Sequence, residues 1–244
     1  MSNQHGRSAR YYDAIYAFKD YHHEAESIRW LLGARGVGDG ATLLDVACGT
    51  GGHLTFLREH YQVEGLDVSP DMLAIARQRH PDVPLHHADM LDFELGRTFD
   101  AVICLFSAIG YARTEPLMRQ AIARMARHVR PGGALVVEPW FRPDQFFAGR
   151  VASRYIDQRN FHVCRMNVSE VAGELSIMDM HFLIGTPDGV DHFVERHELG
   201  LWTQAQMTDA FTAVGMTVEA FDDGLMGRGL YVARQPGGDD ASRP

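Results

Sequence analysis

The stretch Thr42–His53, TLLDVACGTGGH, determines how this chain folds. Its first residues are mostly apolar and suit a buried strand, five residues rich in glycine follow, and a helical pattern begins at Leu54. This order predicts a strand, a glycine turn and the start of a helix. Glycine adopts backbone conformations closed to other residues and lets a ligand approach the main chain. We therefore expect a nucleotide-like ligand at Gly49 and Gly51.

An acidic residue in this stretch narrows the choice of ligand. A dinucleotide-binding turn has the pattern G-x-G-x-x-G, whereas this chain has D-x-A-x-G-x-G-G, with Asp45 four residues before the first glycine. A carboxylate there repels a pyrophosphate and suits a cation. The sequence therefore predicts a cofactor with an ammonium and a sulfonium, and Asp45 disfavours a nicotinamide oxidoreductase.

A second predicted strand, Gln62–Asp67, ends in an acid about twenty residues beyond the glycine turn. In doubly wound folds an acid at this position accepts hydrogen bonds from both hydroxyls of a ribose, so Asp67 is the candidate ribose ligand. Ser69 and Pro70 then predict the start of a helix. On this helix Met72 faces either the adenine or the protein core, and both alternatives stay open.

Three segments together, LLDVACGTGGH, EGLDVSPDML and HHADMLDF, resemble the class I S-adenosylmethionine-dependent methyltransferases over residues 41–138. The resemblance implies an α/β fold with a Rossmann-like, doubly wound, mostly parallel sheet, and S-adenosylmethionine as the cofactor. It also implies that Asp89 binds the exocyclic amine of adenine and that Met90 packs on the ring. The apolar run 98–106 predicts a central buried strand, and we expect Leu105 and Tyr111 near the transferred methyl group.

The chain outside this core also shows a pattern. Alternation of strand and helix stops between residues 141 and 201, where period-two runs predict an inserted antiparallel β platform for the substrate. The segments 216–221 and 229–233 predict a closing antiparallel hairpin. We therefore divide the chain into a helical N-terminal lid (1–40), the cofactor-binding core (41–140), the platform (141–201), a C-terminal helix with the closing strands (202–234) and a disordered tail (235–244).

The N-terminal segment is rich in tyrosine and has helical periodicity. Packing of two helices on the core is one explanation. The alternative is a lid over the open strand ends that excludes water, with Tyr12, Tyr16 and Tyr21 facing the site.

Four later motifs, FSAIGY, EPWFRP, MHFLI and GRGLYV, are similar to those of bacterial deoxysugar N,N-dimethyltransferases, which act on thymidine-diphosphate-linked amino sugars. That resemblance covers nearly the whole chain. It implies cofactor contacts at Tyr12, Tyr21, Ala47, Asp67, Asp89, Met90 and Leu105. It implies substrate contacts at Trp140, Ser153, Arg154, Tyr155, Asp157 and Arg228. An excess of arginine over acid between residues 142 and 165 agrees with a diphosphate, because guanidinium groups suit phosphates. The chain departs from the family at Ala108, Phe141 and Arg142, which leaves the sugar and its nucleotide open.

The expected methyl transfer requires mainly that the protein hold the acceptor amine and the methyl donor in the correct orientation. A neutral amine attacks the sulfonium methyl in line, and one amine proton must leave. Tyr111, Glu138 and His181 are the candidates for positioning or proton acceptance, with a core role for His181 as an equal alternative. We expect no metal, because the adjacent histidine pairs lack ligand spacing and no cysteine cluster accompanies them.

Composition sets further limits. The 244 residues are 45% apolar, with a net charge of −9, so no overall positive field attracts nucleic acid or an anionic membrane, and we expect a small-molecule partner. The three cysteines have no paired spacing, which is typical of reduced thiols. No apolar run is long enough to span a membrane, and residues 1–10 lack the apolar stretch of a signal peptide. We therefore expect a cytoplasmic protein. A homodimer and a place in antibiotic biosynthesis complete the expectations. An O-methyltransferase and a non-catalytic binder of S-adenosylmethionine remain as alternatives.

Overall fold

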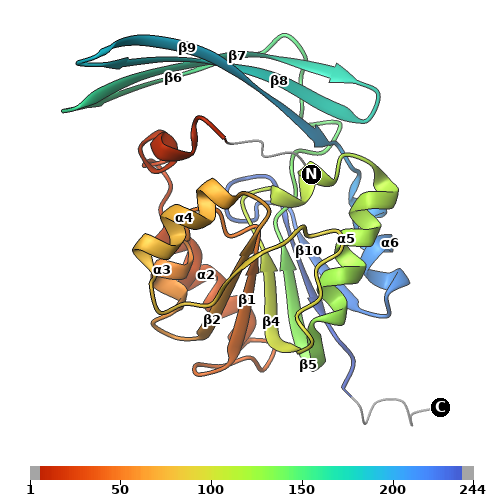
Figure 1. Ribbon diagram of the computed structural model, residues 1–244. Coiled ribbons are helices and arrows are strands. Elements are labelled where there is room, and N and C mark those ends of the chain that lie inside the picture. The colour runs from red at the N-terminus through yellow and green to blue at the C-terminus, as the bar shows by residue number, and fades with distance from the viewer. Residues whose placement is uncertain (1–5, 238–244) are drawn as a thin grey trace.

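The computed structural model describes residues 6–237, which form a seven-stranded sheet beneath a separate four-stranded sheet (Figure 1). The central sheet has the order β10-β11-β5-β4-β1-β2-β3. Strands β1 to β5 run parallel, and β11 pairs antiparallel with both β5 and β10. The strand bounds are β1 Thr42–Val46, β2 Gln62–Asp67, β3 Leu85–His87, β4 Phe99–Cys104, β5 Val129–Val137, β10 Thr217–Phe221 and β11 Leu230–Arg234.

Helices cover both faces of this sheet because its central strands are apolar on both sides (Figure 1). In β1, Leu43 packs in the cluster with α2, α3 and α4, whereas its neighbour Leu44 packs in the cluster with α5 and α6. The helix bounds are η1 Ala9–Tyr11, α1 Tyr12–Ile15, α2 Tyr21–Gly33, α3 Leu54–Leu57, α4 Pro70–Arg79, η2 Ala108–Ala112, α5 Glu115–Arg127 and α6 Gln204–Ala213.

The four longest helices, α2, α4, α5 and α6, each begin after a residue whose side chain caps the helix. Ser69 accepts a hydrogen bond from the backbone N–H of Met72 and precedes Pro70 in the first turn of α4. Thr203 and Gln206 form a reciprocal capping box at the start of α6. These caps fix where each helix leaves the edge of the sheet.

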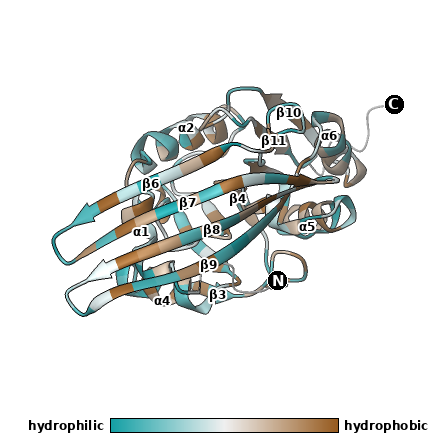
Figure 2. Ribbon diagram, turned by 90° about the horizontal axis from the view of Figure 1, so that it is seen from above, coloured by the Kyte–Doolittle hydropathy of each residue, from teal (hydrophilic) through white to brown (hydrophobic). Residues whose placement is uncertain are grey.

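The second sheet is a platform of four antiparallel strands, β6 Val151–Gln158, β7 Phe161–Ala172, β8 Leu175–Thr186 and β9 Gly189–Gly200. Figure 2 shows it lying across the molecule with apolar and polar residues interspersed along its strands. Its inner face includes Val163, Phe182 and Phe193, which pack on Tyr11 and Ile15 of the N-terminal segment. The N-terminal segment is therefore held between the platform and the core.

The predicted fold is confirmed, with two differences. Strand β6 was not predicted, because its residues are mostly exposed and lack a clear alternation. The turn-like residues Arg130, Pro131, Gly132 and Gly133 predict that the fifth strand begins at Ala134, but β5 begins at Val129 and its pairing with β4 shifts register across this segment. Gly133 fits there because a Cβ atom would lie 2.7 Å from the carbonyl oxygen of Asp100.

The predicted disordered tail falls mostly on residues 238–244, which lie outside the described residues. Its first residue, Gln235, is tied to the core by backbone hydrogen bonds to Gly132 and Gly133. Within residues 6–237, no helix combines the length and apolar character needed to cross a membrane.

Candidate active site

A cavity of about 700 Å³ lies between the carboxyl ends of the parallel strands and the inner face of the platform. Its floor includes Asp45 from β1, Asp67 from β2 and Leu105 at the end of β4. Its roof includes Ser153 and Met178 of the platform. Ligands of open α/β sheets bind at this edge, and a cavity of this size suits a small ligand.

The glycine turn reaches the cavity through a strained backbone. Ala47 and Gly49 have φ angles of 61° and 56° and both line the cavity. A positive φ is uncommon for alanine, and it turns the chain sharply at the end of β1. Gly51 is not in the cavity wall, which corrects its assignment as a ligand contact. A Cβ atom there would lie 2.8 Å from the ring of His80, so this glycine allows packing instead.

Two buried carboxylates lie on the cofactor side of the cavity. Asp67 accepts hydrogen bonds from the backbone N–H groups of Gly49 and Ser69, each at 2.8 Å. Asp45 is 2% exposed, and its Oδ2 has no hydrogen-bond partner among residues 6–237. Burial raises the pKa of both carboxyl groups, and the charge of Asp67 raises that of Asp45 further. An unpaired buried acceptor of this kind suits a cationic ligand group.

Methionines form the wall next to Asp67. Met72 and Met90 line the cavity and are almost fully buried, at 2% and 5% exposure. Asp89 does not line the cavity, and its Oδ1 accepts a hydrogen bond from the backbone N–H of Leu91. Met90 therefore lines the cavity as predicted, and contact between Asp89 and the adenine remains a prediction.

The N-terminal segment closes one side of the cavity with Tyr12, Tyr16 and Tyr21. The ring of Tyr21 lies on Gly52, where a Cβ atom would come within 2.7 Å of it. Thr50 in the glycine turn donates a hydrogen bond to Asp13 at 2.7 Å. The segment is thus attached directly to the glycine turn, as expected of a lid.

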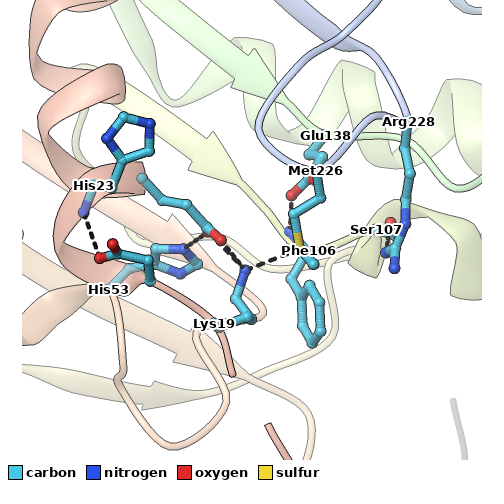
Figure 3. A network of polar contacts seen from close by, with 10 residues as sticks. Lys19, His23, His53, Phe106, Ser107, Glu138, Met226 and Arg228 are labelled. Carbon is cyan, nitrogen blue, oxygen red and sulfur yellow. Dashed lines mark hydrogen bonds and ion pairs between the residues drawn. The ribbon is translucent and has the colours of Figure 1, made fainter. Parts of the chain in front are cut away.

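A buried ionic network around Lys19 joins the N-terminal segment to the segments around the cavity (Figure 3). The Nζ of Lys19 lies 2.6 Å from both carboxylate oxygens of Glu24, which also pairs with His53 at 2.7 Å. Burial alone would raise the pKa of Glu24, but His53 and Lys19 outweigh it and lower that pKa. Lys19 also lies 4.1 Å from the ring centroid of Phe106 and 3.4 Å from the sulfur of Met226. Lys19 therefore contacts Glu24 of α2, the turn after β4 and the loop before β11, and Glu24 links it to His53 at the end of the glycine turn.

The turn after β4 is held in an unusual conformation. Phe106 and Ser107 have φ angles of 52° and 63°. Glu138 accepts a 2.6 Å hydrogen bond from the backbone N–H of Phe106, and Ser107 donates one to the carbonyl oxygen of Pro139. Glu138 is fully buried and outside the cavity wall. Glu138 therefore holds this turn in place, which agrees with the positioning alternative for this residue rather than with direct proton acceptance from the acceptor.

The opposite half of the cavity is rich in arginine. Its wall includes Arg150, Arg154, Arg165 and Arg228. Arg228 donates a hydrogen bond to Ser107 at 2.9 Å and lies 4.7 Å from the ring centroid of Trp140. Burial lowers the pKa of Arg228, which is still far above neutral for a guanidinium.

Two buried donors in this half have no hydrogen-bond partner among residues 6–237. They are the Nε of Arg165 and the Nδ2 of Asn167, both on the inner face of β7. Buried donors usually have an acceptor. The acceptor half is therefore suited to an anionic or oxygen-rich ligand, in contrast to the carboxylates across the cavity.

Three further predicted residues, besides Gly51, Asp89 and Glu138, lie outside the cavity wall. His181 is exposed on the outer face of the platform, with its Nδ1 3.3 Å from the Nε2 of His192, so it is wrong as a catalytic candidate. Tyr155 and Asp157 are exposed and both contact His162 instead. Arg154 and Ile156 lie on the inner face of β6, and Tyr155 and Asp157 alternate with them and point to the opposite face. Ser153 has the same parity as Tyr155, but it lies near the start of the strand and lines the cavity.

His197 was not predicted from the sequence, yet it lines the cavity from β9 and is 1% exposed. Its Nδ1 lies 2.8 Å from the hydroxyl oxygen of Tyr111. The sequence contains a pattern that could have identified it, because His197 and Leu199 alternate with the polar residues Arg196 and Glu198 along β9, as residues on the inner face of a strand do. No group of three or more metal-ligating side chains occurs in the described part of the chain.

The fold and the cavity define an S-adenosylmethionine-dependent methyltransferase, and comparison with known proteins agrees. Residues 43–133 match the methyltransferase domain family. The chain is 45% identical over 230 residues to dTDP-3-amino-3,6-dideoxy-alpha-D-glucopyranose N,N-dimethyltransferase of Streptomyces fradiae, covering 93% of this chain and 90% of the relative. The chain therefore belongs to the bacterial sugar N,N-dimethyltransferase family, and it is an enzyme with S-adenosylmethionine as its cofactor.

Two solved structures have the same fold along nearly their full length. DesVI of Streptomyces venezuelae has a TM-score of 0.88 and 41% identity, covering 95% of this chain and 99% of that one. CalS10 of Micromonospora echinaspora, an amino pentose methyltransferase solved with S-adenosylmethionine bound, has a TM-score of 0.83 and 40% identity. That match covers 92% of this chain and 96% of CalS10.

Proposed function

We propose that this enzyme transfers methyl groups from S-adenosylmethionine to the amino group of a nucleotide-diphosphate-linked amino deoxysugar. The observation that supports this most directly is the charge division of one cavity, with buried carboxylates at the sheet edge and guanidinium groups beneath the platform. The 45% identity of the chain with a relative named for a dTDP-amino sugar supports the same acceptor class.

The cofactor half fits S-adenosylmethionine in its polar groups. The orphaned Oδ2 of Asp45 suits the ammonium of the cofactor. Asp67 uses each carboxylate oxygen once on the backbone, and each retains a further lone pair for a ribose hydroxyl. Met72, Met90 and Leu105 offer apolar contact to the rest of the molecule.

The acceptor half fits a sugar diphosphate. Arg228 and Arg154 supply guanidinium groups from opposite walls, and the ring of Trp140 is fixed by a 2.9 Å hydrogen bond from its Nε1 to Ser176. Planar guanidinium groups bind phosphate oxygens in pairs, and an indole face packs on a sugar or base. We assign the diphosphate to the arginines and the sugar to the space between Trp140 and Tyr111.

The chemistry follows from holding two ligands in line. S-adenosylmethionine supplies, when bound, an electrophilic methyl group that needs no further activation. The protein orients the neutral amine toward it, and the lid with Tyr12 and Tyr21 excludes water. Among the three candidates from sequence, only Tyr111 lies in the cavity wall, so it is the group that we place next to the amine.

The test is a radiolabelled methyl-transfer assay with nucleotide-linked sugars that carry the amine at C3 or C4, and with matched hydroxyl sugars as controls. We expect label in an amino sugar, and mass spectrometry then counts the methyl groups. Transfer to the hydroxyl controls alone would identify an O-methyltransferase and refute the proposal.

We further propose a cytoplasmic enzyme of antibiotic-sugar biosynthesis that acts as a homodimer. The structural relative CalS10 is involved in calicheamicin biosynthesis, which supports the pathway class. The outer face of the platform exposes Met166, Leu183 and Val194, an apolar surface that suits a second copy. Light scattering of the purified protein at twice the monomer mass would support the dimer, and a monomer mass would refute it.

A further inference from the structure

The contact between Tyr111 and His197 joins the core to the platform inside the cavity. Tyr111 lies in η2, directly after β4, and His197 lies on the inner face of β9, opposite Met178 of β8. The hydroxyl oxygen of Tyr111 is 2.8 Å from Nδ1 of His197, and both residues line the cavity. This is a hydrogen bond between a cavity-wall phenol and a buried imidazole.

A glycine lets these two elements come so close. A Cβ atom on Gly110 would lie 2.9 Å from a methyl carbon of Leu199 and 3.3 Å from the Cβ of Trp140. Without a side chain at this position, η2 packs directly on β9. The register of Tyr111 with His197 is therefore built into the backbone packing rather than left to flexible side chains.

The proton of this hydrogen bond can come from Tyr111 or from His197. The two arrangements differ in whether the phenol oxygen can accept a hydrogen bond from a ligand in the cavity. Burial raises the pKa of Tyr111, as do the charges of Glu195 and Asp67, so the phenol is neutral at physiological pH and has one proton to donate. If Tyr111 donates its hydrogen bond to Nδ1 of His197, the lone pairs of the phenol oxygen can accept a hydrogen bond from a ligand. If Nδ1 carries the proton, the phenol accepts from the ring instead.

We propose that His197 is a positioning residue whose unprotonated Nδ1 accepts a hydrogen bond from the Tyr111 hydroxyl, so that the phenol oxygen is left as an acceptor for an N–H of the substrate amine. An amine that donates one N–H to a fixed oxygen has its lone pair held in a defined direction. This is the requirement of in-line attack on the methyl carbon. The inference rests on the proposed function for the identity of the amine.

One test reads the tautomer without any acceptor. In protein labelled with ¹⁵N-histidine, we expect His197 to have its proton on Nε2 and an unprotonated Nδ1, with a resonance shift in Tyr111→Phe that identifies the ring. A proton on Nδ1 would overturn the proposal whatever the substrate is.

The second test is a double-mutant cycle with the acceptor that the wild-type enzyme methylates. Leu and Asn have similar shapes, but only Asn retains an acceptor near the position of Nδ1. We expect His197→Leu and Tyr111→Phe each to lower kcat about tenfold, and His197→Asn to stay within about threefold of wild type. In the Tyr111→Phe background, His197→Leu should have no further effect.

A merely structural His197 would give the same loss in both backgrounds, and His197→Asn would be no better than His197→Leu. Either result would overturn the proposal. A wild-type enzyme that methylates no amino sugar would instead contradict the proposed function, and the tautomer measurement would still decide the role of His197 toward Tyr111.

Discussion

The two halves of the cavity are built in different ways. The cofactor half is made by short consecutive segments at the ends of β1, β2 and β4, where Asp45, Asp67 and Leu105 are placed by the strands themselves. The acceptor half is assembled from residues far apart in the chain, such as Trp140 and Arg228. The first half has buried carboxylates and the second has guanidinium groups. Under the proposed function, this difference in charge separates a cationic donor from an anionic acceptor.

The largest expected effect comes from Lys19, because it is buried between Glu24, which pairs with His53, and the cavity-wall residues Phe106 and Met226. Its side chain is fully buried against Glu24, so Lys19→Met leaves a buried carboxylate without its cation. We expect the free energy of unfolding to fall by about 3 to 5 kcal/mol. Urea denaturation measures the change, and the affinities for both ligands should weaken together.

Two controls test that interpretation of Lys19. The double variant Lys19→Met with Glu24→Leu replaces the pair by apolar groups and should recover most of the lost stability. Arg29→Met, which breaks an exposed pair with Asp39, should change stability little. If Lys19→Met were as mild as Arg29→Met, the two halves would be joined by other contacts.

Asp67→Ala tests the cofactor half by itself. Loss of the charge-assisted hydrogen bonds to the ribose should weaken S-adenosylhomocysteine binding by about 1 to 3 kcal/mol, with acceptor binding unchanged. Calorimetry measures both affinities, and Asp92→Ala is the matched control because it removes an exposed carboxylate from the same region. An equal loss for the acceptor would contradict the division.

Arg228→Ala is the counterpart in the acceptor half. We expect a smaller loss, about 1 to 2 kcal/mol in acceptor affinity, because three further arginines share that wall. Cofactor affinity should be unchanged. Arg142→Ala is the control, since Arg142 pairs with Asp222 outside the cavity and its loss should spare both ligands. A cofactor loss as large as the acceptor loss in Arg228→Ala would argue against separate halves.

The pH dependence of cofactor binding tests the two buried carboxylates without a substitution. Burial raises the pKa of Asp45 and Asp67 in the free enzyme, and a cationic ligand favours their charged forms. Above these raised pKa values the affinity should be constant. As the pH falls through them, the affinity should drop by at most about tenfold per pH unit for each group, because binding must then release a proton. Calorimetry in buffers of different ionisation enthalpy detects that proton, and Asp45→Asn should reduce its release. A pH-independent affinity in the wild type would contradict the role of these carboxylates.

The same contrast explains what the sequence could predict. The floor of the cavity was predictable because Asp45, Ala47 and Asp67 belong to local strand-and-turn patterns whose geometry is set within a few residues. The structure places them in the cavity wall, and their individual ligand contacts remain predictions.

The roof was not predictable to the same accuracy, because a shift of one residue along a strand reverses the face of every side chain. His181 was chosen in β8, yet the histidine that faces the cavity is His197 in β9. Likewise Tyr155 is exposed while its neighbour Arg154 reaches the cavity. Buried ion pairs between a loop and a helix, such as the one that Lys19 makes, were missed because they leave no periodic signal.

A crystal structure of the enzyme with S-adenosylhomocysteine and thymidine diphosphate together would examine the charge division of the cavity in a single experiment. We expect the adenosine at Asp67 and Met90, the amino group of the cofactor product at Asp45, and the diphosphate between Arg228 and the platform. A diphosphate at the glycine turn, or two ligands that exclude each other from the cavity, would contradict the division.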